Sequence, residues 1–328
     1  MTFMQTRERS TATVRSFAAD DYAAITRLYN ANFPEFVMRA DDFPFDDQHR
    51  SERCRWARWV AECAGRVVGF GHYAQGDHHY HPRKFQLAIM VDPAYFGRGI
   101  GGQLYELVMR ELQPLNPLQV DEWSREDMVC RVGFLERRGF VADMRLWTSR
   151  LDLARFEPNR FADDVQHVEA QGIQLRTFAE LGVDDPGVRH KLFELWLATR
   201  DDVPRPPEDV ASEVSFEHWW DRTGRADLLP AGYFVALDGD QYVGTSQLWH
   251  SPEACELRTG LTAVRREYRR RGIALALKVK SLEFGKAQGY ERAVTENEIN
   301  NHGMIGINDR LGFVKQPAYV HYLKRLDS

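Results

Sequence analysis

The chain has 328 residues, of which 43% are hydrophobic and 28% are charged, and its formal net charge is −5. This length exceeds what one hydrophobic core usually serves, so we expect two globular domains. The acidic balance argues against a general binder of nucleic acid or of membrane surfaces, and it favours small or neutral partners.

The first half of the chain alternates strand and helix patterns. These predict a strand at 13–17, a helix at 25–33, a hairpin over 56–62 and 66–73, a strand at 84–91, a glycine-rich turn before a helix at 104–112, a strand at 118–120, a helical stretch from 126 and a closing strand at 145–151. Residues 156–171 are polar and acidic without a clear period, and we expect them to be a linker.

The second half repeats this order and completes the predicted domain pair, 1–155 and 172–328. We expect a strand at 174–178, helices at 188–199 and 210–220, a hairpin over 233–237 and 241–249, a strand at 256–264, a helix from 273 through 280, a strand at 292–295, a helix at 301–310 and a last strand at 318–323.

The two halves match at a fixed offset. Four pairs of identical residues lie 173 positions apart: Val91 and Val264, Gly99 and Gly272, Leu104 and Leu277, Gly139 and Gly312. We therefore predict a tandem duplication of the α/β or α+β class, in which each copy is a mixed central sheet flanked by helices.

The stretch from Val264 to Leu277 is the first candidate for a site. A strand ends at Val264, Gly272 permits a tight turn, and the Ala-Leu-rich run that follows is typical of a helix. The first N–H groups of a helix have no intrahelical partner and lie at the positive end of its dipole. This stretch is therefore expected to bind an anion such as a phosphate.

Both copies resemble the GNAT family of N-acetyltransferases. The signature of that family is Gln or Arg, two residues, Gly, one residue, and then Gly or Ala at the start of a helix. In the N-terminal copy Gly99 and Gly101 match, but Phe96 stands where Gln or Arg is expected. A later Arg-Gly-Phe or Leu-Gly-Phe element is present in both copies. The C-terminal copy matches at all three positions, Arg269, Gly272 and Ala274.

The resemblance implies that the loop amides hold the pyrophosphate of acetyl-CoA, and that two splayed strands accept its pantetheine arm. The arginines would add ion pairs to the phosphates. The implied loop residues are Val264, Arg269, Arg270, Arg271, Gly272, Ile273 and Ala274 in the second copy, and Val91, Gly97, Arg98, Gly99, Ile100 and Gly101 in the first.

A second segment carries the rest of the implied cofactor site. Asn297 and Asn301 resemble the family residues that hold the pantetheine arm, and helix capping is their alternative role. The counterpart segment of the first copy, 120–126, has no Asn and looks degenerate. The chain thus has two copies, and the second has the better site. This arrangement is similar to that of mycothiol synthase and related tandem acetyltransferases, but the resemblance does not identify mycothiol as the substrate.

Direct attack by an amine needs a base, an oxyanion donor and an acid for the leaving thiolate. Many members of the family use a Tyr acid, and the corresponding positions here are Asn308 and Leu135. Asn308 is kept as a candidate at this catalytic position, although neither side chain can act as an acid. Water, Tyr319 or Tyr322 could supply the proton instead, and ordinary packing is the alternative role of both tyrosines.

For the base, Glu256 is the candidate, because it lies on the strand that enters the loop. Thr262 shares its face by the two-residue period of a strand, and the alternative for Glu256 is a solvated surface position. The amide of Val264 is the candidate oxyanion donor. The implied function is an N-acetyltransferase that moves an acetyl group from acetyl-CoA to a primary amine of a small molecule.

Two other functions stay open. A non-catalytic module that binds acyl-CoA is suggested by the missing Tyr, and binding of nucleic acid through 265–271 is disfavoured by the net charge. We expect no metal, because the histidines of 78–81 have no acidic or thiol partner at an informative spacing.

Acidic and aromatic clusters near the first helix of each copy suggest an acceptor pocket. Asp41–Asp42 and Asp46–Asp47 could attract a cationic amine, and solvated loop acids are the alternative. Phe43–Phe45 and Trp219–Trp220 could line such a pocket or fill the core.

The compartment is predicted from cysteine usage and from the N-terminus. The cysteines show neither CxxC pairing nor zinc-finger spacing, so we expect reduced core thiols. Residues 1–10 lack the apolar region of a signal peptide, and no apolar run approaches the ~18 residues that span a bilayer. The predicted localisation is cytoplasmic, with no membrane association.

Overall fold

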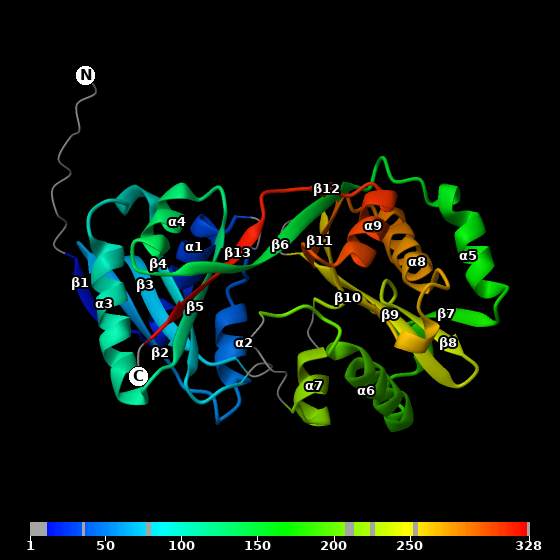
Figure 1. The fold of residues 1–328 in the computed structure, drawn as a ribbon, viewed down its shortest axis with the longest axis horizontal. Coiled ribbons are helices and arrows are strands. Elements are labelled where there is room, and N and C mark those ends of the chain that lie inside the picture. The colour runs from blue at the N-terminus through cyan, green and yellow to red at the C-terminus, as the bar shows by residue number, and fades with distance from the viewer. Residues whose placement is uncertain are drawn as a thin grey trace, which may run out of the picture.

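The computed structural model describes residues 12–34, 37–76, 80–206, 213–223, 227–251 and 255–326. Its central element is one continuous mixed sheet of 13 strands, covered by helices (Figure 1). The strands follow the order β1-β2-β3-β4-β5-β13-β6-β11-β10-β9-β8-β7, and the short β12 pairs with β6. The predicted α/β class with mixed sheets is confirmed, and the sheets of the two copies are joined edge to edge.

The N-terminal half contributes six strands: β1 (Thr13–Ser16), β2 (Trp56–Cys63), β3 (Arg66–Ala74), β4 (Lys84–Val91), β5 (Gln119–Arg125) and β6 (Val141–Asp152). Its helices are α1 (Tyr22–Asn32), α2 (Asp42–Gln48), α3 (Ile100–Leu112) and α4 (Val129–Glu136). Separate apolar clusters beneath α1 and beneath α3 show that the two helices cover opposite faces. The short helix α2 was not predicted.

The C-terminal half contributes β7 (Ile173–Thr177), β8 (Phe234–Asp238), β9 (Gln241–His250), β10 (Glu256–Val264), β11 (Arg292–Glu298), β12 (Val314–Lys315) and β13 (Tyr319–Arg325). Its helices are α5 (Ala162–Glu169), α6 (Pro186–Arg200), α7 (Phe216–Thr223), α8 (Ile273–Ala287) and α9 (His302–Leu311). In Figure 1, α6 and α7 lie on one face and α5, α8 and α9 on the other. Of the helix predicted at 210–220, residues 210–212 lie outside the described part, and α7 begins at Phe216.

The last strand of the chain belongs in space to the first copy. β13 is antiparallel to β5 on one side and to the first part of β6 on the other. The remainder of β6, from Leu146 to Asp152, pairs with β11 of the second copy. Figure 1 shows the red β13 beside the green β5 and β6. The two halves therefore exchange strands where they meet.

The expected linker has regular structure. Residues 158–161 form a 3-10 helix and 162–169 form α5, which packs on α8. The apolar residues of this segment recur every three or four positions, so they share one face and enter the second core: Phe156, Phe161, Val165 and Val168. The expectation of an irregular linker was therefore wrong, while the division of the chain into domains stays a prediction.

Two further expectations concern the cysteines and membranes. The four cysteines, all within the described residues, are not in disulfides; Cys54 is buried, but Cys130 and Cys255 are exposed, so the description as core thiols was wrong for these two. Within the described residues, no helix has both the length and the apolar character that crossing a membrane requires.

Candidate functional site

The loop before α8 has the predicted strand, turn and helix. Gly272 is the residue before the helix and has a left-handed backbone with φ of 83°, a conformation that glycine adopts at little cost. Arg270 is also left-handed, with φ of 62°. The amides that open α8 at Ile273 and Ala274 have no intrahelical carbonyl to bind. The loop is therefore built to receive an anion at the helix N-terminus.

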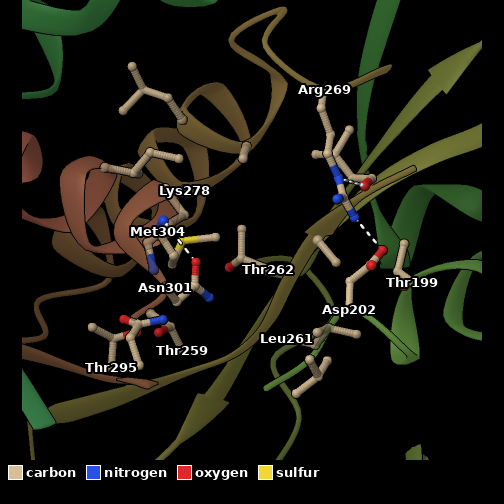
Figure 2. A pocket seen from close by; sticks show the side chains of 18 of the residues that line it. Thr199, Asp202, Thr259, Leu261, Thr262, Arg269, Lys278, Thr295, Asn301 and Met304 are labelled. Atoms are coloured by element: carbon tan, nitrogen blue, oxygen red, sulfur yellow. Dashed lines mark hydrogen bonds and ion pairs between the residues drawn. The ribbon is translucent and has the colours of Figure 1, made fainter. Parts of the chain in front are cut away.

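Below the loop, β10 and β11 diverge. They are parallel and paired only over Glu256–Arg258 and Arg292–Val294. A register shift between Thr259 and Thr262 bends β10 away from the ladder with β9. The space between the strands is a cavity of about 920 Å³, called here the donor cavity (Figure 2). Splayed strands, as the resemblance implied, therefore lie directly below the loop.

Most of the predicted cofactor residues of the second copy line the donor cavity. These are Val264, Arg269, Arg270, Gly272, Ile273, Ala274, Asn297 and Asn301. Arg271 does not line it: its Nε donates to Oε1 of Gln171 at 2.8 Å, and its guanidinium lies over the ring of Tyr268. The role predicted for Val264 as an oxyanion donor stays a prediction; this residue pairs with Gly244 at the end of β10.

Two arginines and one aspartate form a charged group at the mouth of the donor cavity. Arg269 donates to the carbonyl of Val264 at 3.1 Å and forms an ion pair with Asp202. Arg266 pairs with the same carboxylate at 2.6 Å. Arg266 first, and Arg269 second, lower the pKa of Asp202. Figure 2 shows Arg269 and Asp202 joined on one side of the cavity, with Asn301 and Met304 on the other.

The three asparagines of the second segment do different things. Asn301 caps α9, because its Oδ1 accepts from the amide of Met304 at 3.2 Å, and it also lines the cavity. Asn308 is buried in α9, and its Nδ2 donates to Oδ1 of Asn297 at 2.5 Å. The Oδ1 of Asn308 has no hydrogen-bond partner among the described residues.

Glu256 does not reach the donor cavity. Its carboxylate is 1% exposed and lies 3.5 Å from Nε of Arg292 and 3.9 Å from Nε of Arg150, at the far end of β10 from the loop. Eight residues of an extended strand separate it from Val264, which is about 26 Å. The prediction of Glu256 as the base is therefore not supported by its position.

Tyr319 and Tyr322 also lie away from the donor cavity. Both are on β13 and are buried in the N-terminal half, where Tyr319 packs against Phe33 with 6.0 Å between ring centroids. The strand exchange explains the difference, because the chain order placed these tyrosines in the second copy. Tyr322 packs in the core of that half, whereas Tyr319 both packs there and lines a second cavity.

A second cavity, of about 860 Å³, lies between the two halves and is called here the acceptor cavity. It is lined by carboxylates and by aromatic side chains from both halves: Asp42, Asp46, Asp121, Asp227, Tyr29, Phe33, Trp123, Trp249 and Tyr319. Asp42 and Asp46 are two of the aspartates predicted to attract a cationic amine. Asp47, which was predicted with them, instead pairs with Arg58 at 2.8 Å. Trp219 and Phe43 are buried in apolar clusters.

The two cavities share four lining residues, Leu146, Thr259, Gly260 and Glu296. Glu296 is the one ionisable side chain of these four. Its side chain is open to the cavities, but burial by the surrounding protein raises the pKa of its carboxyl, and Arg258 opposes this rise. The alternation of β11 could have revealed Glu296, since it points opposite to Thr295 and Asn297.

The loop of the N-terminal copy has the same shape as the other loop. Gly99 is left-handed with φ of 85° and precedes α3. Arg98 lies over the ring of Tyr95, with 4.7 Å to the ring centroid. None of the predicted residues Val91 and Gly97–Gly101 lines the donor or the acceptor cavity.

Two charged side chains bridge the strands below that loop. Glu122 on β5 accepts from the amide of Ile89 on β4 at 3.1 Å. Arg131 on α4 donates to the carbonyl of Ile89 at 2.9 Å and forms a close ion pair with Glu122. The ring of Phe134 lies 3.3 Å from where a Cβ on Gly101 would stand. At the 173-residue offset, the matching positions of the second copy line the donor cavity: Thr262, Thr295, Met304 and Ile307.

Comparison with known proteins gives two family matches. The model described as "Acetyltransferase (GNAT) domain" matches residues 56–142, and the one described as "Acetyltransferase (GNAT) family" matches residues 190–313. The two matches fall in the two copies that the sequence repeat predicted.

Relatives agree with these matches. N-alpha-acetyltransferase 30 of Schizosaccharomyces pombe is 32% identical over 117 residues, which are 34% of this chain and 72% of that protein. Mycothiol acetyltransferase of Rhodococcus jostii is 26% identical over 269 residues, 80% of each chain. A solved tandem GNAT protein from the clavulanic acid biosynthesis pathway shares 19% identity, with a TM-score of 0.75 over 97% of this chain and 99% of its own.

Proposed function

The chain belongs to the GNAT family of acetyltransferases, and from this premise we propose that its C-terminal copy transfers an acetyl group from acetyl-CoA to a primary amine of a small molecule. One observation carries the proposal. The donor cavity below the phosphate loop meets the acceptor cavity at Glu296. A thioester and an amine could therefore approach each other from opposite sides of the sheet.

The residues of the donor cavity suit acetyl-CoA. The free amides at the start of α8 and the guanidinium groups of Arg269 and Arg270 would bind the pyrophosphate. Asn297 and Asn301 would bind the amides of the pantetheine arm between β10 and β11. Acetyl-CoA would supply the activated acyl group, and the chain would hold it in place.

The acceptor cavity suits a cationic amine. It is also lined by Arg39, Arg131 and Arg258, but its carboxylates outnumber these arginines and favour an ammonium group. Its aromatic rings can contact either a cation or an apolar body. The amine must lose a proton to attack the thioester carbon, and Glu296 lies where the cavities meet. A carboxyl whose pKa is raised toward neutrality is a more effective base at physiological pH than an ordinary one.

The missing Tyr acid supports a second candidate, a module that binds acyl-CoA without turnover. Asn308 at that position cannot release a proton. This candidate predicts binding of acetyl-CoA with no release of thiol.

The test is turnover of acetyl-CoA with a panel of small primary amines, followed by the appearance of free thiol and of the acetylated product. Amine-dependent release of thiol is expected, with mono- and polyamines compared at the same concentration. Tight binding of acetyl-CoA with no thiol release for any amine would contradict the enzyme and support the binding module.

A further inference from the structure

A lysine is buried in the wall of the donor cavity. Lys278 is the sixth residue of α8, about 9 Å along the helix axis from Gly272. The residue is 1% exposed, yet it lines the cavity. In Figure 2 it is drawn on the same side of the cavity as Met304 and Asn301, opposite Arg269 and Asp202. Lys278 is therefore a buried part of the cavity wall, beyond the phosphate loop along α8.

Lys278 has no carboxylate partner among the described residues. Its Nζ lies over the ring of Phe313, 5.4 Å from the ring centroid. Lys280, two residues further on, is instead paired with Glu283 at 3.1 Å. A buried ammonium without a counter-ion is costly, and burial lowers the pKa of Lys278 to about 7.

The ionisable groups around the donor cavity come from several of the elements that border it, while β10 and β6 contribute none. β11 contributes Glu296 and Glu298, α9 contributes Arg310, and the loop contributes Tyr268, Arg269 and Arg270, with Asp202 after α6. Asp202 pairs with Arg266 and Arg269, and Arg310 pairs with Asp164 at 2.8 Å. None of these groups forms an ion pair with Lys278 in the described part of the chain.

The proposed reaction lacks an acid at the position where the family places it. The thiolate of CoA leaves when the carbon–sulfur bond breaks, and a proton donor or a cation nearby stabilises it. Asn308 cannot donate a proton as an acid, and its Nδ2 is already bound to Asn297. A buried, unpaired ammonium in the same cavity wall is suited to this task.

We propose that Lys278 is the acid of this reaction and donates a proton to the sulfur of CoA. This inference rests on the proposed function. The amine first releases its ammonium proton to solvent, and its neutral nitrogen then forms a bond to the thioester carbon. Glu296 takes a second proton from that nitrogen and later returns it to solvent, and the carbon–sulfur bond breaks. The electron pair of that bond goes to sulfur, which takes a proton from Nζ of Lys278. The products are the amide and CoA, and Lys278 is left neutral until solvent returns its proton.

The test compares CoA with desulfo-CoA, which lacks the sulfur atom, by calorimetric binding to the full chain at pH 7. Wild type is expected to bind CoA about tenfold more tightly than desulfo-CoA, as one hydrogen bond to a charged group allows. The matched control K280M should keep this ratio. In K278M and K278Q the two ligands should bind with equal affinity. An unchanged ratio in both Lys278 variants would overturn the proposal.

A kinetic measurement separates this inference from the proposed function. With an accepted amine, K278M should lower kcat by about 100-fold, the size of one acid catalyst, while KM for acetyl-CoA changes less than about threefold. If wild type released no thiol with any amine, the proposed function would fail, and the CoA to desulfo-CoA ratio would still decide whether Lys278 contacts the sulfur. Unchanged kcat in an active K278M would overturn the acid role.

Discussion

The two copies share a phosphate loop and differ below it. Gly99 and Gly272 have nearly the same φ, 85° and 83°, and each precedes a helix after a 3-10 turn. In the first copy, Glu122 and Arg131 bind both backbone groups of Ile89. In the second copy, Thr295 and Met304 stand at these positions and leave the groove open.

We propose from this difference that the glycine loop alone does not make a site for acetyl-CoA, because the space below the loop must also be open. Splayed strands leave backbone N–H and C=O groups that need partners, and a buried polar group without a partner is destabilising. In the first copy, the ion pair of Glu122 and Arg131 supplies such partners to both backbone groups of Ile89. On this proposal, binding depends on two side chains some thirty residues beyond each loop.

The largest expected effect comes from placing the ion pair of the first copy in the second. The double variant T295E/M304R should fill the donor cavity and reduce acetyl-CoA affinity at least ~100-fold, the scale of a lost ligand site. Calorimetry measures this change. The control V141E/V314R adds the same side chains at two exposed positions and should bind normally. Normal affinity in T295E/M304R would show that this pair does not close the first groove.

The next effect concerns the residue where the cavities meet. E296Q should lower kcat by about 100- to 10,000-fold, the range of a general base, with acetyl-CoA affinity unchanged. Because burial raises the pKa of Glu296, the activity of wild type should rise with pH over a range that lies above the pKa of an ordinary glutamate. The activity that remains in E296Q should not show this rise. The exposed E291Q is the control, and equal kcat in both variants would exclude Glu296 as the base.

A smaller effect is expected at the loop position where the copies differ, Phe96 in the first and Arg269 in the second. R269A should weaken acetyl-CoA binding about tenfold, because one charge-assisted hydrogen bond to a phosphate is lost. Added salt should reduce the difference from wild type. R110A, on an exposed face of α3, is the control and should bind as wild type does. Equal affinities of R269A and R110A would remove Arg269 from the cofactor site.

The last prediction concerns stability instead of binding or turnover, and it compares Lys278 with its counterpart Tyr105, whose hydroxyl accepts from Lys324 at 3.0 Å. The folded pKa of Lys278, about 7, lies below its value of 10.5 in an unfolded chain. The unfolded chain therefore binds more protons between these values, and the free energy of unfolding of wild type relative to K278M should rise with pH from 7 to 10. The slope should approach about 1 kcal/mol per pH unit in urea denaturation.

The matched control for this pH dependence is Y105F, which changes the same position of the first copy. The stability of wild type relative to Y105F should stay flat between pH 7 and 9. A flat curve for K278M as well would mean that Lys278 keeps an ordinary pKa in the folded protein.

The loops and the repeat were predictable from sequence because they depend on local chain geometry. Gly272 in a strand-turn-helix pattern requires a left-handed residue, and the fixed offset located its twin Gly99. The helix at 162–169 could also have been found, since Val165 and Val168 are spaced for one face. The periodicity was missed because this helix also contains several acidic residues.

Two of the catalytic candidates lie away from the donor cavity for reasons that no local pattern contains. Glu256 lies on the expected strand, but the residues of that strand that line the donor cavity begin three positions later, at Thr259. Tyr319 was assigned to the second copy because it follows Asn308 along the chain, whereas β13 pairs in the first. Pairing between distant strands is set by the whole sheet. Glu296 and Lys278 could not be singled out from the sequence, because the cavities that they line form only after this pairing.

The exchange of β13 has a consequence for how the protein is made. β5 ends at Arg125, and its neighbour β13 begins at Tyr319, so this edge stays unpaired until the chain has been synthesised through β13. Such distant pairing slows folding and leaves an open strand edge exposed meanwhile. Neither half can complete its own sheet when produced alone. Removal of β13 would therefore expose the edges of β5 and β6 in the middle of the continuous sheet.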